Sequence, residues 1–414
     1  MKTNMDRKKD KLDFMATHRS YLLAAESVTE GHPDKLADQI SDAVLDEALA
    51  QDPYSRVACE TLVSHNLIVV AGEITTRARL DIPEIVRRVF KKTGYTNQEE
   101  GFDLSGWNIV LNIKEQSQEI AQAVGEKSGE ISMGRGKSEV ADDNIRAGDQ
   151  GQMFGYATDE TPELMPLPLM LAHRLVMKTD ELRHAGKIPW LRPDGKSQVT
   201  VRYEGEKPVA VESVVLSLQH QKGVRYNELI EALKKEIIEK VIPLELLSST
   251  TEFIINPSGE FITGGPEADT GLTGRKTIVD TYGAACPHGG GCFSGKDPTK
   301  VDRSGAYAAR YIAKNIVAAG LARRCTVQLS YAIGRSEPTS LTVNTQGTGN
   351  IPDREIEEAV RKIFPLTPGR IIRELKLRRP VYSLTSVYGH FGRNLPEFTW
   401  EYTDRVEALR LYFK

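Results

Sequence analysis

The sequence predicts an α+β fold made of three similar units. A pattern of two strands followed by a helix recurs three times along the chain, and consecutive strands of this kind pair as hairpins. A length of 414 residues accommodates two or three domains. Apolar residues make up 40% of the chain and charged residues 27%, which is ordinary for a globular protein. We therefore expect mixed or antiparallel sheets packed with helices.

The composition argues against several classes of partner. The formal net charge of −3 gives no general attraction to nucleic acid. The 4 cysteines show no paired framework, which suits a reducing cytosol. No run is long and apolar enough to span a membrane, and residues 1–19 lack the apolar core of a signal peptide. We therefore expect a cytoplasmic protein that binds neither nucleic acid nor membranes.

The first third of the chain contains a charged extension, a helix and a hairpin. Residues 1–19 carry little to bury, so we expect a disordered extension there. A strand over 21–25 precedes a helix that begins at Pro33, because proline suits the first helical position. Apolar residues recur after it at helical spacing: Leu36, Ile40, Val44, Leu45 and Leu49. We then expect a hairpin, a helix and a strand, over 56–63, 67–74, 82–92 and 107–113.

A long polar segment interrupts this pattern. Residues 116–149 are rich in glycine, serine and mixed charges, and loops of this length are usually lids or disordered segments. A helix over 164–184 follows, and Pro193-Asp194-Gly195-Lys196 predicts a turn. The remaining expected strands are 198–203, 209–217, 253–255, 278–280, 325–333 and 339–344. The remaining expected helices are 226–240, 303–319, 352–363 and 369–374, with Asp302 as the N-cap of the second.

One glycine-rich stretch carries the clearest chemical signal. Residues 288–297 read His-Gly-Gly-Gly-Cys-Phe-Ser-Gly-Lys-Asp, and Lys300, Asp302 and Arg303 follow. Glycine backbone approaches a ligand closely, while cations neutralise phosphates and carboxylates hold Mg²⁺. The stretch is not a P-loop, because Asp297 stands where Ser or Thr is required and no buried strand precedes it. The alternative is a flexible turn with a solvated lysine.

Similar polar clusters framed by glycine or proline occur at 26–35, 146–151, 193–196, 264–276 and 288–302. Their cations are numerous enough to neutralise a triphosphate: Lys196, Arg275, Lys276, Lys296 and Lys300. Asp34 and Asp302 suit Mg²⁺, although each also suits a helix N-terminus without any ligand. His32 is alternatively a capping histidine. Glu60 and Glu73 lie in predicted strands, facing either solvent or a ligand. These residues predict a transferase that uses ATP and Mg²⁺, with an acceptor that they do not define.

The chain resembles the S-adenosylmethionine synthases (methionine adenosyltransferases) of bacteria and eukaryotes from about Ala25 to about Arg393. The matching motifs are Glu30-Gly31-His32-Pro33-Asp34-Lys35, residues 147–151, Arg192-Pro193-Asp194, residues 271–276, residues 289–297 and residues 388–392. The resemblance implies formation of S-adenosyl-L-methionine from ATP, L-methionine and water. The methionine sulfur attacks C5′ of ATP, and the expelled triphosphate is hydrolysed to pyrophosphate and phosphate. The alternatives are another Mg²⁺–ATP-dependent transferase and a non-catalytic subunit of the same fold.

The resemblance also implies roles for individual residues. The implied catalytic residues are His32, Lys196, Arg275, Lys276 and Lys296. The implied ATP contacts are His32, Asp194, Lys196, Glu260, Phe261, Asp269, Arg275, Lys276, the backbone at Cys292, and Lys296. The implied methionine contacts are Glu73, Gln116, Asp149, Asp269 and Lys300. Asp34 and Asp302 are the implied Mg²⁺ ligands, with two Mg²⁺ per site expected, and Glu60 lies at the implied K⁺ site.

The implied architecture is three similar α+β domains in a pseudo-threefold arrangement, discontinuous in sequence. The expected divisions are an extension (1–19), an N-terminal domain (20–122), a mobile lid (123–146), a central domain (147–264) and a C-terminal domain (265–408). The resemblance implies a homodimer with active sites shared between subunits, and a homotetramer is expected. The choice between dimer and tetramer, the turnover rate and the role of the lid do not follow from the sequence.

Overall fold

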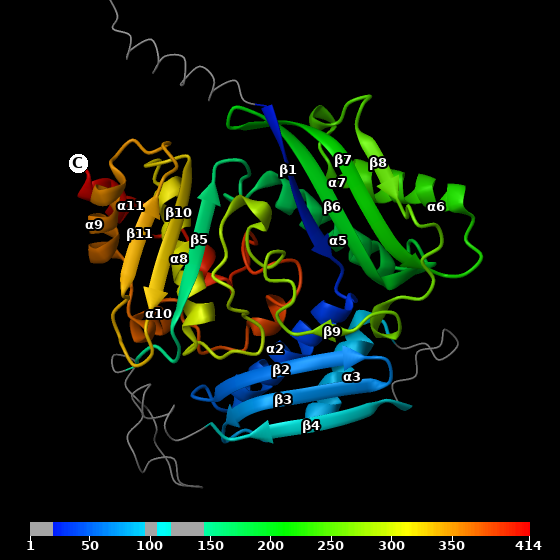
Figure 1. Cartoon of the computed structure of the whole chain (residues 1–414), viewed down its shortest axis with the longest axis horizontal. Helices are drawn as coiled ribbons and strands as arrows, with labels where there is room; N and C mark the ends of the chain where they lie inside the picture. Colours follow the sequence, from blue (N-terminus) through cyan, green and yellow to red (C-terminus); the bar gives the residue numbers. More distant parts are fainter. Residues whose placement is uncertain (1–19, 96–105, 117–144) are drawn as a thin grey trace, which may run out of the picture.

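The computed structural model describes residues 20–95, 106–116 and 145–414, which form three sheets with helices packed against them (Figure 1). The expected extension and nearly all of the expected lid lie outside these residues. The α+β class with three domains is confirmed. Among the described residues, no helix combines the length and the apolar character that crossing a membrane requires.

The first sheet joins the start of the described chain to its middle. Its strand order is β1-β6-β7-β8. These strands are β1 (Ser20–Val28), β6 (Leu191–Glu204), β7 (Lys207–His220) and β8 (Glu252–Ile255). Helix α5 (Leu167–His184) packs on β1 and β6, while α6 (Tyr226–Leu233) continues through a π-helical turn into α7 (Glu239–Val241). These elements share one buried cluster, which includes Leu175, Val199 and Val214. Alternation of buried residues along β6 therefore sets its register.

The second sheet has the order β4-β3-β2-β9. These strands are β2 (Arg56–Ser64), β3 (Leu67–Thr75), β4 (Asn108–Lys114) and β9 (Gly271–Leu272). Helices α2 (Pro33–Gln51) and α3 (Ile82–Thr93) lie beside this sheet, and α2 packs on β2. Strand β9 comes from residues far along the chain, so the sheet binds a C-terminal segment to the N-terminal hairpin.

The third sheet has the order β11-β10-β5 and is antiparallel. These strands are β5 (Gly151–Thr158), β10 (Arg324–Tyr331) and β11 (Ser340–Asn344). The C-terminal helices are α8 (Val301–Ala318), α9 (Asp353–Ile363), α10 (Pro368–Glu374) and α11 (Val406–Tyr412). Strand β5 touches α8 backbone to backbone, because a Cβ at Gly155 would lie 2.0 Å from the carbonyl carbon of Ala309. Long helix α8 is thereby held close to the sheet.

Four local predictions were wrong. Residues 193–196 lie within β6, where a bulge between Leu191 and Gly195 absorbs the turn-forming residues. Residues 278–280 form turns, since Asp280 donates its backbone N–H to Lys276 O as in a helical turn. Asp302 lies in the first turn of α8, and Lys300 is its N-cap. The fourth error is the omission of β5, because two glycines weakened its strand pattern.

Candidate active site

The N-terminus of α2 places a neutral histidine beside a carboxylate. His32 is the N-cap, and its Nδ1 accepts the backbone N–H of Asp34 at 3.1 Å. Burial, followed by the charge of Lys276, lowers the pKa of His32 to about 3, although Asp34 opposes the shift. The imidazole is therefore neutral at pH 7. Because Nδ1 acts as acceptor, the ring carries its proton on Nε2, which remains available as a donor.

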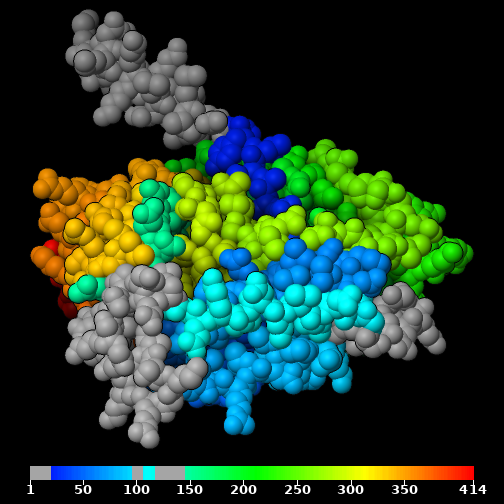
Figure 2. Space-filling view, turned by 60° about the horizontal axis from the view of Figure 1, so that its bottom comes forward, coloured from blue at the N-terminus to red at the C-terminus, as the bar shows by residue number. Residues whose placement is uncertain are grey.

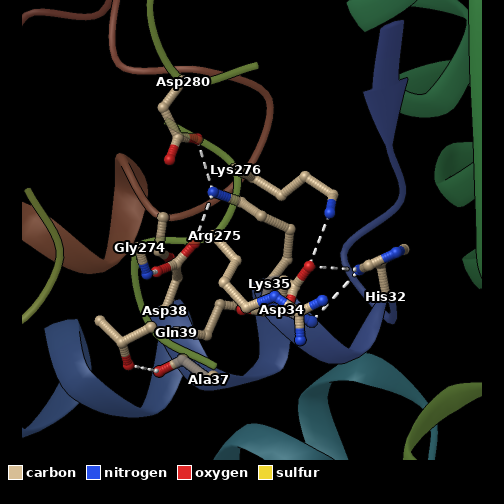
Figure 3. A network of polar contacts seen from close by, with 12 residues as sticks. His32, Asp34, Lys35, Ala37, Asp38, Gln39, Gly274, Arg275, Lys276 and Asp280 are labelled. Carbon is tan, nitrogen blue, oxygen red and sulfur yellow. Dashed lines mark hydrogen bonds and ion pairs between the residues drawn. The ribbon is translucent and has the colours of Figure 1, made fainter. Parts of the chain in front are cut away.

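Asp34 holds the loop that carries two of the predicted phosphate-binding cations (Figure 3). Its Oδ1 accepts the backbone N–H of Leu272 at 3.0 Å, and its Oδ2 accepts Lys276 Nζ at 2.6 Å. Arg275 Nε lies 3.5 Å from Oδ1. Burial by itself would raise the pKa of Asp34, but the hydrogen bond and charge of Lys276 outweigh it and lower the pKa. The carboxylate is thus ionised and carries cations on its outer side.

A second lysine–aspartate pair lies at the glycine-rich loop. Lys296 Nζ is 2.6 Å from Asp302 Oδ2, and both side chains are largely buried. The other oxygen of Asp302 lies against glycine, because a Cβ at Gly291 would be 2.4 Å from Oδ1 and one at Gly151 would be 3.3 Å from it. Any larger residue at Gly291 would displace the carboxylate, so this position requires glycine.

The separate glycine-framed segments contact one another. Lys296 forms an isolated antiparallel bridge with Ala58 of β2. A Cβ at Gly274 would lie 2.4 Å from Cys292 Cβ, and one at Gly289 would lie 1.7 Å from Gln152 O. Clusters 146–151, 264–276 and 288–302 therefore meet beside the N-terminus of α2. The arrangement suits a polyphosphate, since three cations and two carboxylates lie beside glycine-rich backbone.

Comparison with known families identifies the arrangement. Models of the N-terminal, central and C-terminal domains of S-adenosylmethionine synthetase match residues 20–118, 144–261 and 263–402. The chain belongs to the S-adenosylmethionine synthetase family. Two curated relatives named "S-adenosylmethionine synthase", from two strains of Thermus thermophilus, are each 59% identical over 390 residues. Each alignment covers 94% of this chain and 98% of the relative.

Of the nucleotide contacts predicted in the central part of this synthetase, Asp194 and Lys196 are linked to the same site. Asp194 Oδ2 accepts the backbone N–H of Gly265 at 2.8 Å, whereas its buried Oδ1 has no partner among the described residues. Burial raises the pKa of Asp194 to about 6. Lys196 is exposed at the bulged end of β6, and its charge acts on His32. Glu260 is exposed, and Phe261 pairs through its backbone with His220.

Several residues assigned by resemblance have other partners here. Lys300 pairs with buried Asp297, and Lys114 pairs with Glu73 at 3.3 Å. Asp149 and Asp269 are exposed, and each accepts the backbone N–H of the next residue. The charge of Asp149 nevertheless acts on Lys296 and that of Asp269 acts on Asp194, so these two carboxylates lie near the cluster without pairing with its cations.

Two further predicted residues belong to the region of the second sheet, Glu60 within β2 and Gln116 just beyond β4. Glu60 is exposed on β2, and its charge acts on Cys292. Gln116 has a buried Oε1 that finds no hydrogen-bond partner in the described part of the chain. An orphaned buried acceptor is costly, so its presence at a predicted ligand contact favours a ligand there.

The synthetase family uses metal ions, and the donor set fits this chemistry. Within residues 20–95, 106–116 and 145–414, no group of three or more histidine, cysteine or acidic side chains is placed to hold a metal alone. Asp34 and Asp302 offer single carboxylates beside cations. Mg²⁺ is commonly held by one or two carboxylates together with substrate phosphates, so this set fits a metal that arrives with a nucleotide.

A buried ionic cluster next to the site was not predicted from the sequence. Lys35 Nζ lies 2.6 Å from Asp280 Oδ1 and 2.9 Å from Asp38 Oδ2 (Figure 3). All three side chains are buried. Asp38 also accepts the backbone N–H of Gly274 at 2.9 Å. The sequence offered one signal, since Lys35, Asp38 and Asp42 follow one another along α2 at spacings of three and four residues, which places them on one side of the helix.

Proposed function

We propose that this chain forms S-adenosyl-L-methionine from ATP and L-methionine, and then hydrolyses the triphosphate to pyrophosphate and phosphate. The observation that carries the proposal is the pair of lysine–aspartate contacts, Lys276 with Asp34 and Lys296 with Asp302, flanking neutral His32. The chain is a methionine adenosyltransferase, as its family membership and its 59% identity to named synthases support.

The site suits this reaction because the nucleophile needs no base. The thioether sulfur is neutral and carries no proton. It forms the S–C5′ bond as the C5′–O bond breaks, and the bonding electrons leave with the triphosphate. The product is a sulfonium, so negative charge builds only on the departing phosphate chain. Fixed cations aimed at that charge stabilise the transition state, and alignment supplies the rest.

We assign the leaving-group chemistry to the cations. Lys276, Lys296, Arg275 and Lys196 take the phosphate oxygens, and Arg275 favours the later cleavage of triphosphate. His32 donates Nε2–H to the departing oxygen, as its neutral state and its occupied Nδ1 allow. When ATP enters, the two lysines exchange aspartate oxygens for phosphate oxygens, which frees Asp34 and Asp302.

We propose that the freed carboxylates of Asp34 and Asp302 hold Mg²⁺, two ions per site, and that Glu60 lies at a K⁺ site. Bound Mg²⁺ neutralises phosphate charge. The remaining ligand contacts of the proposal are Asp194, Glu260, Phe261, Asp269 and Cys292 for ATP, and Glu73, Gln116, Asp149, Asp269 and Lys300 for methionine. The buried oxygens of Asp194 and Gln116 that find no hydrogen-bond partner among the described residues support two of these assignments. We further propose domain divisions at about residues 122, 146 and 264.

We propose a homodimer with shared active sites, and a homotetramer built from it. An apolar row crosses the outer face of the second sheet, with Leu272, Leu62, Val69 and Val110 paired in register across its four strands. Leu272 is 39% and Val110 46% exposed. In Figure 2, β4 (cyan) forms a band on the surface. Such a patch marks an interface, and Glu60 and Glu73 lie on the same face, which brings them into a shared site.

One assay tests the activity. The protein is incubated with ATP, L-methionine, Mg²⁺ and K⁺, and products are identified by mass spectrometry. S-adenosylmethionine with pyrophosphate and phosphate is the expected result. Release of ADP with a labelled acceptor would instead identify another transferase, and binding of ATP without product would identify a non-catalytic subunit.

A pair of lysine variants tests the site. Lys296→Ala should lose most single-turnover formation of S-adenosylmethionine, because one phosphate contact is removed. Lys240→Ala removes an exposed lysine on α7 and serves as the control. Equal rates in the two variants would defeat the assignment of Lys296.

A further inference from the structure

Helix α2 carries a row of aspartates, Asp34, Asp38, Asp42 and Asp46, one every four residues. In an α-helix, each step of four residues advances about 6 Å along the axis and turns about 40°, so the row follows one side of the helix. Like charges at this spacing destabilise a helix. Asp34, Asp38 and Asp42 are nevertheless almost completely buried. The burial and mutual repulsion of these carboxylates must be offset by interactions with the segments that cover them.

Each aspartate of the row accepts backbone N–H groups from a segment more than 200 residues away. Asp34 accepts that of Leu272 and Asp38 that of Gly274. Asp42 accepts the N–H of Gly295 at 2.8 Å. Asp46 accepts those of Tyr382 at 2.9 Å and Ser383 at 2.7 Å. The row therefore fixes the backbone of three C-terminal segments in order along one helix.

The loop that bears Arg275 and Lys276 is held at both ends. Asp38 fixes its start at Gly274, with the N–H at 2.9 Å. Lys35 fixes its end, because its ammonium joins Asp38 to Asp280. Figure 3 shows the Lys35 ammonium between these two carboxylates, to one side of the Asp34–Lys276 contact. The two cations thus project from a short segment whose ends are both tied to α2.

The glycine-rich loop is held by Asp42 in the same way. Arg303 Nη1 and Nη2 lie 2.7 and 3.0 Å from the two oxygens of Asp42. The same guanidinium donates to Phe293 O at 3.0 Å and Lys296 O at 3.2 Å. The backbone on both sides of Gly295 is therefore tied to the Asp42–Arg303 pair, which fixes the point from which the Lys296 side chain extends.

We propose that Asp38 and Asp42, together with Lys35 and Arg303, are positioning residues that set the spacing between the two phosphate-binding loops. The inference rests on the proposed function, since it concerns the same triphosphate. All four side chains are at most 1% exposed, so they act through the loops and not by touching a ligand. Asp46 belongs to the same row but holds residues 382–383, which carry none of the proposed phosphate cations.

The test compares Asp38→Asn and Asp42→Asn with Asp46→Asn as the matched control. Because a displacement of about 1 Å costs about 100-fold in rate, we expect the first two variants to lose about 100-fold in kcat. Their KM for ATP should change far less, since the cations remain. Asp38→Asn should also accumulate triphosphate, because its loop carries Arg275. Asp46→Asn should keep kcat within about twofold of the original, as expected for a group remote from the cations.

Thermal unfolding separates positioning from general damage. The inference is overturned if Asp38→Asn and Asp42→Asn keep kcat within about twofold, a difference too small for displaced phosphate contacts. The inference is equally overturned if the loss of kcat is proportional to the loss of Tm in all three variants, Asp46→Asn included. Should Asp42→Asn not fold, Arg303→Lys replaces it, because lysine keeps the charge but lacks the planar set of donors. Failure of the unsubstituted chain to form S-adenosylmethionine would instead refute the proposed function.

Discussion

Replacing Lys35 with methionine should destabilise the protein strongly above neutral pH. The ammonium of Lys35 is the cation shared by Asp38 and Asp280, at 2.9 and 2.6 Å, and the three side chains are buried. Methionine keeps the length of the side chain but leaves two carboxylates without a counterion. Breaking a buried pair by removing one partner costs about 3–5 kcal/mol, so we expect a loss of this size in the free energy of unfolding at pH 8.

The loss should shrink in acid. Burial, only partly offset by Lys35, raises the pKa of Asp280 to about 7, and burial also raises the pKa of Asp38. Both folded-state pKa values thus exceed the unfolded value of about 3.9, so the folded state binds more protons between these limits and loses stability as pH rises through them. Removing Lys35 raises both values further. The variant should therefore recover stability at pH 5.5 relative to pH 8.

Urea unfolding at both pH values, followed by fluorescence and circular dichroism, measures these losses. Asp280→Asn is the control: it leaves Lys35 paired one to one with Asp38 and keeps an oxygen acceptor, so its cost should be below about 1 kcal/mol. A Lys35→Met loss below about 1 kcal/mol at pH 8 would refute the reasoning, because a desolvated pair cannot be broken so cheaply. Equal losses at pH 5.5 and pH 8 would refute the role of the carboxylates.

Three further outcomes are expected. Gly155→Ala should destabilise the fold by more than about 2 kcal/mol, measured by urea unfolding, because the new Cβ meets the backbone of Ala309 at 2.0 Å. Asp194 has a raised pKa of about 6 and an oxygen without a hydrogen-bond partner among the described residues. The affinity for a non-hydrolysable ATP analogue, measured by calorimetry, should therefore rise with pH through about 6 and then level off. Asp194→Asn should abolish that dependence, and an unchanged pH profile in the variant would exclude Asp194 as its source. Cys292→Ala should retain turnover because its proposed ATP contact is made through the backbone. Gly274→Ala should lose turnover, since Gly274 has φ of 80° and its new Cβ would lie 2.4 Å from that of Cys292; equal turnover in the two variants would contradict this packing.

Much of the fold followed from local pattern. Strands β2, β3 and β10 largely alternate buried and less buried side chains, and helix α3 has a proline at its start and a glycine at its end. These local patterns predict the elements correctly. Where the prediction was wrong, a distant segment decides the structure. Residues 193–196 have turn chemistry, but pairing with β1 and β7 draws them into a strand.

The sequence indicated which residues belong to the site, but it did not indicate which residues pair with one another there. Spacing indicated that Asp34 and Asp302 lie at helix ends, yet nothing local shows that Lys276 and Lys296 pair with them. The role of the aspartate row on α2 was even harder to predict from the sequence. Asp38 and Asp42 resemble the solvated side of an amphipathic helix, and only coverage by residues 272–303 turns that side into an interior.

The pairing of β1 with β6 cannot form until residues 196–204 have been synthesised. Residues 20–28 lie in register against residues 196–204, with no earlier strand of the described chain beside them in that sheet. While the ribosome makes the intervening residues, β1 remains unpaired. Pairing between segments this far apart in the sequence is also slow. An unpaired strand edge invites pairing with another chain. The first strand of the nascent protein is therefore open to pairing with other chains from the emergence of residue 28 until that of residue 204.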